Sequence, residues 1–134
     1  MSDDKRFLWI AVDFDGTITS SDAWPNIASE NPDAIHVIRR LRKDGHKVIL
    51  HTCRRGIYLE QALEWLKNHN VTLDAINDNP WAREFYGDNV PGPKMFADYY
   101  IDDRALGIKK TSTGSVDWKY IKRNYKKLFT RNRL

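Results

Sequence analysis

The sequence predicts an α/β fold: a three-layer α/β/α sandwich around a mostly parallel, Rossmann-like sheet. Short apolar runs of strand length alternate with segments whose apolar residues recur at helical spacing. The first run, residues 7–12, is apolar throughout, which is typical of a parallel strand buried on both faces. Because strands that alternate with helices pair in parallel, we expect helices on both faces of the sheet.

The other elements follow from local signals in chain order. A helix is expected to begin at Pro32-Asp33 and to end at Gly45, and a second helix to cover 57–69. Residues 16–32 and 77–93 are rich in Ser, Thr, Asn, Pro or Gly and are predicted to be loops. Further strands are predicted over 47–51, 73–76 and 97–101, with a fifth candidate over 106–108 and a last helix from about 116.

Composition places the chain among ordinary globular domains. Hydrophobic residues make up 41% and charged residues 30% of its 134 residues, and no repeat or linker divides it, so we expect one domain over 1–134. No apolar run is long enough to span a membrane, and the acidic start does not resemble a signal peptide. Cys53 is the only cysteine, so an internal disulfide is impossible and a cytoplasmic location is expected.

Positive charge is concentrated at the end of the chain. Nine of the 22 Lys and Arg residues follow residue 108, where Asp117 is the only acid. Such a segment could bind nucleic acid, or it could be the solvated face of a terminal helix. Both interpretations stay open.

Polar side chains accompany the carboxyl ends of three predicted strands. In open parallel sheets, ligands bind outside these ends, so these side chains should line a common site. Residues two apart on an extended backbone share a face, and acids at such a spacing can point to one spot. The candidates are Asp13 and Asp15 after the first strand, Thr52 and Arg54 after the second, Lys94 just before the fourth, and Asp102 and Asp103 after it.

Four converging carboxylates require a counter-charge. Two like charges about 4 Å apart repel by about 4 kcal/mol at an effective dielectric of about 20. Lys94 would offset one charge and a divalent cation two more. Ligands that are all oxygen atoms favour a hard metal such as Mg2+. The set therefore predicts a magnesium ion beside a bound phosphate.

These residues resemble the four motifs of the haloacid dehalogenase superfamily. Asp13-Phe14-Asp15-Gly16-Thr17 is similar to the first motif, Thr52 to the second, Lys94 to the third and Asp102-Asp103 to the fourth, in the same order. The resemblance implies a Mg2+-dependent phosphohydrolase that cleaves phosphate monoesters. Since dehalogenases of this superfamily lack the acid at the place of Asp15, carbon–halogen chemistry is not expected.

The resemblance also implies a role for each residue. Asp13 would attack phosphorus and form an aspartyl-phosphate, and Asp15 would protonate the leaving group and then activate water. Thr52 and Lys94 would hold the phosphoryl oxygens, and Lys94 would also orient Asp13. Arg54 is a further candidate for substrate binding. The metal would be held by the Asp13 carboxylate, the Asp15 carbonyl and one acid of the last pair. Asp103 is favoured as the direct ligand, with Asp102 behind it.

The spacing between the motifs indicates which kinds of substrate the site could accept. Superfamily members usually carry a cap domain after the first or second motif, but only 36 residues separate Asp15 from Thr52 and 41 separate Thr52 from Lys94. We therefore expect no cap domain and an open site whose rim is formed by residues 17–31 and 77–93. A small phosphate ester such as a nucleotide is the expected substrate. A polynucleotide 3′-phosphatase, another macromolecule-directed phosphatase and a non-catalytic phosphate- or metal-binding module are the alternatives, and the oligomeric state is open.

Three other features have simpler interpretations. A cysteine phosphatase needs an arginine six residues after its cysteine, but Leu59 follows Cys53 at that distance. The four histidines show no metal-ligand spacing. Trp118 and Tyr125 are expected in the core, whereas aromatic residues of the two predicted loops are candidates for substrate contact. These loop residues are Trp24, Trp81, Phe85 and Tyr86.

Overall fold

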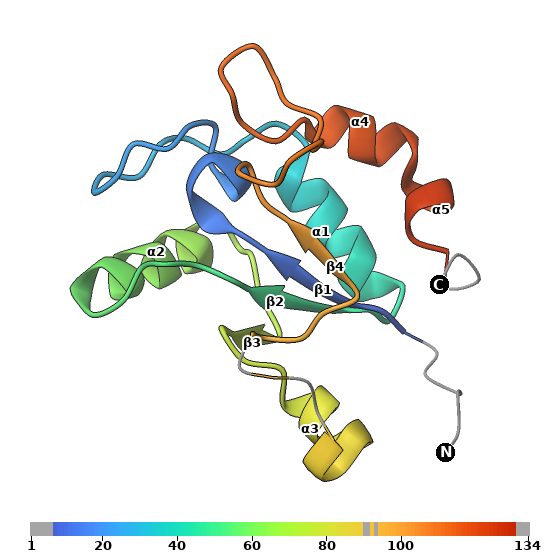
Figure 1. Ribbon diagram of the computed structural model, residues 1–134. Helices are drawn as coiled ribbons and strands as arrows, with labels where there is room; N and C mark the ends of the chain where they lie inside the picture. Colours follow the sequence, from blue (N-terminus) through green and yellow to red (C-terminus); the bar gives the residue numbers. More distant parts are fainter. Residues whose placement is uncertain (1–6, 90–91, 93, 131–134) are drawn as a thin grey trace.

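The computed structural model describes residues 7–89, 92 and 94–130. Its centre is a sheet of four parallel strands in the order β3-β2-β1-β4 (Figure 1). Val12, the last residue of β1, lies opposite Leu50 and Ile101, so three neighbouring strands end level with one another. The predicted α/β fold is confirmed, and the sheet is parallel throughout. The strands are β1 (Trp9–Val12), β2 (Lys47–Leu50), β3 (Ala75–Ile76) and β4 (Tyr99–Ile101).

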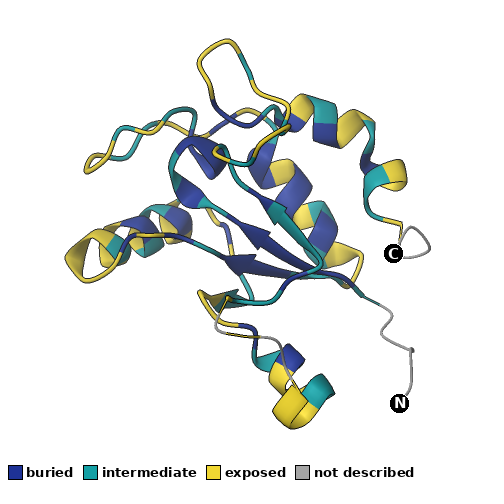
Figure 2. Ribbon diagram, in the orientation of Figure 1, coloured by how far each residue is buried: buried dark blue, intermediate teal, exposed yellow. Residues whose placement is uncertain are grey.

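One face of the sheet carries the larger core. Alternate residues of β1, among them Ile10 and Val12, pack with buried residues of β2 and of four helices. Figure 2 shows the buried stripe on the sheet-facing side of α1. These helices are α1 (Ala34–Lys43), α2 (Ile57–Asn68), α4 (Trp118–Arg123) and α5 (Tyr125–Leu128). Trp118 and Tyr125 are buried here, as predicted.

The opposite face is covered by α3 (Pro80–Tyr86) and a group of aromatic side chains. Trp9 and Ala11 of β1 point to this side because successive side chains of a strand alternate. The Trp9 ring makes edge contacts with Phe85 and Phe96, with centroids 5.9 and 5.8 Å away. Together the two faces complete the three layers, and no segment of the described residues forms a cap domain.

The predicted loop over 77–93 is wrong at its centre. Residues 80–86 form α3 and Gly87–Asn89 a short 3-10 turn, while residues 90, 91 and 93 lie outside the described residues. Pro80 occupies the first turn of α3, and the Asn79 side chain accepts a hydrogen bond from the Ala82 N–H at 2.9 Å. Pro80 thus marks the start of a helix in this segment.

The end of the chain differs from expectation in two places. Residues 106–108 form no strand; Gly107 adopts a φ of 86°, and the nearby pairing is an isolated bridge between Lys110 and Val116. The last helix is interrupted at Asn124, which separates α4 from α5. In the part of the chain described, no helix combines the length and the apolarity needed to cross a membrane.

Candidate active site

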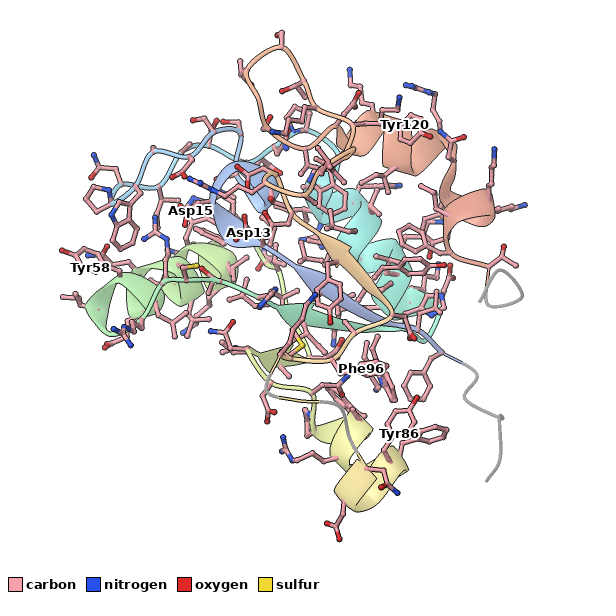
Figure 3. The ribbon with its side chains drawn as sticks, in the orientation of Figure 1. Asp13, Asp15, Tyr58, Tyr86, Phe96 and Tyr120 are labelled. Carbon is pink, nitrogen blue, oxygen red and sulfur yellow. The ribbon has the colours of Figure 1, made fainter. Side chains whose placement is uncertain are left out.

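A cavity of about 350 Å³ opens at the carboxyl ends of β1, β2 and β4. Figure 3 shows Asp13 and Asp15 close together just beyond the end of β1. Six of the seven predicted site residues line this cavity, and Lys94 is the exception. The lining consists of Asp13, Asp15, Asp22, Trp24, Thr52, Cys53, Arg54, Asp102, Asp103 and Arg104.

Three of the acids form a tight cluster. Asp13, Asp102 and Asp103 each offer a carboxylate oxygen within 4.8 Å of the other two. Burial, followed by the negative charge of Asp102, raises the pKa of Asp13 from 3.8 to about 8. Burial also raises the pKa of Asp103. Because burial disfavours the charged forms of Asp13 and Asp103, a cation at the cluster would stabilise them.

Thr17 joins the first strand end to the fourth. Its hydroxyl donates to Asp13 Oδ2 at 3.1 Å and accepts from the Asp103 N–H at 3.0 Å. Its carbonyl accepts from Asn31 Nδ2 at 3.0 Å and from Trp118 Nε1 at 2.7 Å. Thr17 stands in the first motif, but sequence reasoning assigned it no role.

Gly16 makes room for Asp103. Its φ is 74°, a left-handed conformation that glycine adopts readily. A Cβ added there would overlap the Asp103 carboxylate, with Cγ only 3.0 Å away. The glycine thus serves both the turn after β1 and the close approach of the fourth strand end.

The Asp15 carboxylate pairs with Arg54 and does not join the cluster of the other three acids. Arg54 Nε and Nη2 donate to its two carboxylate oxygens, both at 2.7 Å, in a bidentate ion pair. The Arg54 side chain is only 1% exposed. The sequence predicted both residues in the site but not their pairing.

Thr52 lines the cavity and contacts the backbone of Arg54. Its Oγ1 accepts from the Arg54 N–H at 3.1 Å, and its own N–H donates to Asn77 Oδ1 at 2.8 Å. The hydroxyl proton can therefore be donated toward the cavity. Asn77, at a φ of 51°, is a second supporting residue that the sequence analysis missed; a positive φ of this kind is one that Asn tolerates.

Lys94 is not brought to the acid cluster. Its ammonium lies 4.3 Å from the centroid of the Tyr100 ring, on an exposed side chain that does not line the cavity. Tyr100 of β4 is next to Ala11 in register and so belongs to the α3 side of the sheet. A phosphate-binding role for Lys94 stays a prediction.

The rim differs from the expected one. Residues 19–30, named the flap here, are closed at their base by a bridge between Thr19 and Glu30 and supply Asp22 and Trp24 to the cavity. Arg104 reaches Asp22 at 3.5 Å from the segment after β4. No described residue of 77–93 lines the cavity.

The four aromatic candidates for substrate contact divide between the cavity and the α3 side of the sheet. Trp24 is 53% exposed beside the cavity. Trp81, Phe85 and Tyr86 instead pack around Trp9, and Figure 3 shows Tyr86 near α3, away from Asp13.

A scan of known family models and a search of curated proteins found no match. Among solved structures, a conserved protein from Bacteroides thetaiotaomicron is 32% identical, with a TM-score of 0.73 over 92% of this chain and 93% of that chain. The chain belongs to the family of this Bacteroides protein. A structural-genomics target from Vibrio cholerae also matches, at 24% identity and a TM-score of 0.45, over 91% of this chain and 99% of that chain.

In this member of the family, the donor set fits a hard divalent cation. The cluster offers carboxylate oxygens from Asp13, Asp102 and Asp103, the ligand type that Mg2+ prefers. A cation there would also favour the ionised form of Asp13, whose pKa is raised by burial and then by the charge of Asp102. Asp15 does not join the cluster through its carboxylate, which Arg54 occupies.

Proposed function

We propose that the protein is a Mg2+-dependent phosphohydrolase that cleaves phosphate monoesters through an aspartyl-phosphate at Asp13. The observation that supports this most is the cluster of Asp13, Asp102 and Asp103 at an open cavity, with a second acid, Asp15, two residues from the first. Mg2+ would neutralise the cluster and polarise a phosphoryl oxygen. It would be held by the Asp13 and Asp103 carboxylates and the Asp15 carbonyl.

Asp103 is the better candidate for the direct ligand of the last pair. Gly16 leaves its carboxylate close to the turn that carries Asp13 and Asp15. The Asp102 carboxylate accepts the Arg104 N–H at 2.8 Å, which suits a supporting place behind the ligands.

The reaction would proceed in two displacements. In the first, an Asp13 oxygen attacks phosphorus, the bond to the leaving oxygen breaks, and Asp15 donates a proton to that oxygen. In the second, Asp15 takes a proton from water, the water oxygen attacks phosphorus, and the bond to Asp13 breaks. Inorganic phosphate leaves, and both aspartates return to their initial states. The Thr52 hydroxyl would hold a phosphoryl oxygen, and Lys94 would join it only by leaving the Tyr100 ring and turning toward the cavity.

A small phosphate ester such as a nucleotide suits the cavity. Its volume of about 350 Å³ and the exposed indole of Trp24 provide space and a flat surface for the leaving group. A polynucleotide 3′-phosphatase is the second candidate, favoured by the exposed basic residues of α4 and α5.

A screen of phosphate esters with and without Mg2+ tests the proposal. It should include nucleotides, 3′-phosphorylated oligonucleotides and a chromogenic ester. We expect turnover that stops in excess chelator and returns with Mg2+, whereas Ca2+ should substitute poorly because its ligands bind at longer, less regular distances. Full activity in chelator would contradict the metal assignment. Mg2+ binding without turnover on any ester would favour a non-catalytic binding module.

A further inference from the structure

We infer that Arg54 is a positioning residue that orients Asp15 and ties it to the flap, and that it does not bind the phosphoryl group. The inference rests on the proposed function, since it concerns how Asp15 serves that reaction. Its basis is the complete use of the Arg54 guanidinium by acceptors of the protein itself.

A guanidinium has five N–H donors in a planar fork. In Arg54, Nε and one N–H of Nη2 bind the two oxygens of Asp15 at 2.7 Å. The second N–H of Nη2 has the Asn26 carbonyl at 3.0 Å, and Nη1 has the carbonyls of Pro25 and Tyr58, both at 3.3 Å. Every donor thus has an acceptor among the described residues, and a phosphate could bind only by displacing one.

The surroundings of Arg54 favour this arrangement over a contact with substrate. The guanidinium lies 5.5 Å from the Phe14 ring centroid and 5.0 Å from that of Trp24. Its side chain is 1% exposed, while that of Asp15 is 15% exposed and lines the cavity. A buried guanidinium is stable only with its partners in place, so we expect Arg54 to stay while Asp15 faces the substrate.

The partners of Arg54 come from three parts of the chain. Asp15 follows β1, Pro25 and Asn26 belong to the flap, and Tyr58 lies in the first turn of α2. The bidentate pair fixes the plane of the Asp15 carboxylate. Because the same guanidinium binds two flap carbonyls, the orientation of Asp15 depends on where the flap lies.

The dependence of kcat/KM on the leaving group distinguishes a positioning role of Arg54 from phosphate binding. An alkyl phosphate needs a proton from Asp15 to release its alcohol, whereas dinitrophenyl phosphate releases a stable phenolate without one. Arg54→Lys keeps the charge but has no fork. We expect its kcat/KM to fall about 100-fold for an alkyl phosphate, within the range for general acid catalysis, and less than about threefold for dinitrophenyl phosphate. In an Asp15→Asn background, Arg54→Lys should add less than about threefold for the alkyl ester.

Arg55→Ala and the wild-type protein serve as controls for the Arg54→Lys result. Arg55→Ala removes the neighbouring, exposed arginine and should stay within about twofold of wild type on both esters; the same loss in Arg55→Ala would overturn the inference. If kcat/KM falls equally for both esters and inhibition by inorganic phosphate weakens, Arg54 binds phosphate and the inference is wrong. If the wild-type protein cleaves neither ester with Mg2+, the proposed function itself fails.

Amide hydrogen exchange, which needs no turnover, tests whether Arg54 holds the flap in place. The Ser20 N–H donates to the Ser29 carbonyl at 2.8 Å and the Asn31 N–H to the Ile18 carbonyl at 2.8 Å. In Arg54→Lys, amide hydrogen exchange of the flap (residues 19–30) and of Asn31 directly after it should become at least about tenfold faster. The thermal midpoint is measured alongside to show that the variant is folded. Unchanged exchange in a folded variant would overturn the link between Arg54 and the flap.

Discussion

Asp13 and Asp15 stand two residues apart, yet their carboxylates meet opposite environments. Asp13 lies with two other acids, and its pKa is raised to about 8 by burial and their charge. Asp15 is held by the guanidinium of Arg54. The nucleophilic role proposed for Asp13 therefore depends on the cation, which would favour the ionised form of this carboxylate at the cluster.

The raised pKa of Asp13 makes the stability of the metal-free protein depend on pH. Between its ordinary value of 3.8 and about 8, the native state keeps a proton that the unfolded chain releases. Native-state proton binding therefore stabilises the fold at low pH, and this contribution is lost as pH rises toward about 8. Asp13→Asn cannot titrate at this position. In urea denaturation with chelator present, its free energy of unfolding should decline less than that of wild type from about pH 5 to about pH 8; parallel declines would contradict the assignment.

Gly16→Ala should damage the metal site more than the fold. The left-handed φ of 74° costs alanine about 1 to 2 kcal/mol. The new Cβ would also displace the Asp103 carboxylate, so we expect Mg2+ affinity and kcat/KM to fall at least about tenfold. Gly45→Ala is the matched control, because its φ is 94° but nothing lies within 4 Å of the added Cβ. Equal Mg2+ titrations of the two variants would show that Gly16 has no special role at the metal site.

The sequence predicted which side chains line the site better than how they interact. Asp13, Asp102 and Asp103 were found because level strand ends bring them together. The partners of Thr17 and Arg54 could not be found by spacing. Trp118 donates to the Thr17 carbonyl across 101 positions of sequence, and the acceptors of Arg54 belong to irregular segments whose paths no local pattern predicts.

At the scale of elements, β1 organises the molecule because both of its faces are buried. Its apolar run predicted this directly. The helix covering the second face was missed because α3 has only seven residues and lies in a segment with several turn-forming residues. Its position depends on aromatic contacts with Trp9, which are tertiary and leave no periodic signal in so short a segment.

Asn79→Ala should destabilise the fold without changing the chemistry. Asn79 is 4% exposed; it caps α3 through Ala82 and donates to the Phe96 carbonyl at 2.8 Å. Loss of the cap and of the buried donor should lower the free energy of unfolding by about 1 to 3 kcal/mol. Asn79→Ser, which keeps a capping oxygen without placing a carboxylate beside the Phe96 carbonyl, should lose less. Urea denaturation measures both, and kcat/KM should stay at the wild-type value because α3 does not line the cavity; a large loss of kcat/KM in a folded variant would contradict this separation.

At the scale of the whole molecule, the strand order explains why residues from three distant segments meet. With β1 between β2 and β4, the segments after Val12, Leu50 and Ile101 emerge side by side. The terminal helices pack on α1, with the Arg40 guanidinium 3.7 Å from the Tyr125 ring centroid, and leave their basic residues exposed. These residues are Lys119, Lys122, Arg123, Lys126 and Lys127, with Lys109 and Lys110 before them; Arg131 and Arg133 lie outside the described residues.

If these basic residues follow a nucleic-acid backbone, binding should weaken steeply with salt. The expected log–log slope is about −0.7 for each phosphate neutralised on single strands. Neutralising Lys122, Arg123, Lys126 and Lys127 together should flatten the slope and raise KM for an oligonucleotide, while KM for a mononucleotide stays unchanged because the smaller ester cannot span both regions. Equal effects on both substrates, or no binding at low salt, would leave the segment as a solvated helix surface.

Covalent catalysis is tested most directly by looking for the phosphoryl group on Asp13 itself. The protein is mixed with Mg2+ and a labelled phosphate ester that it turns over, quenched in acid within one turnover, and digested for mass spectrometry. We predict a phosphorylated peptide modified at Asp13, absent from Asp13→Asn, whose turnover should fall at least about 10^3-fold while its fold is retained. Turnover without a label on Asp13, together with appreciable activity of Asp13→Asn, would contradict covalent catalysis by this residue.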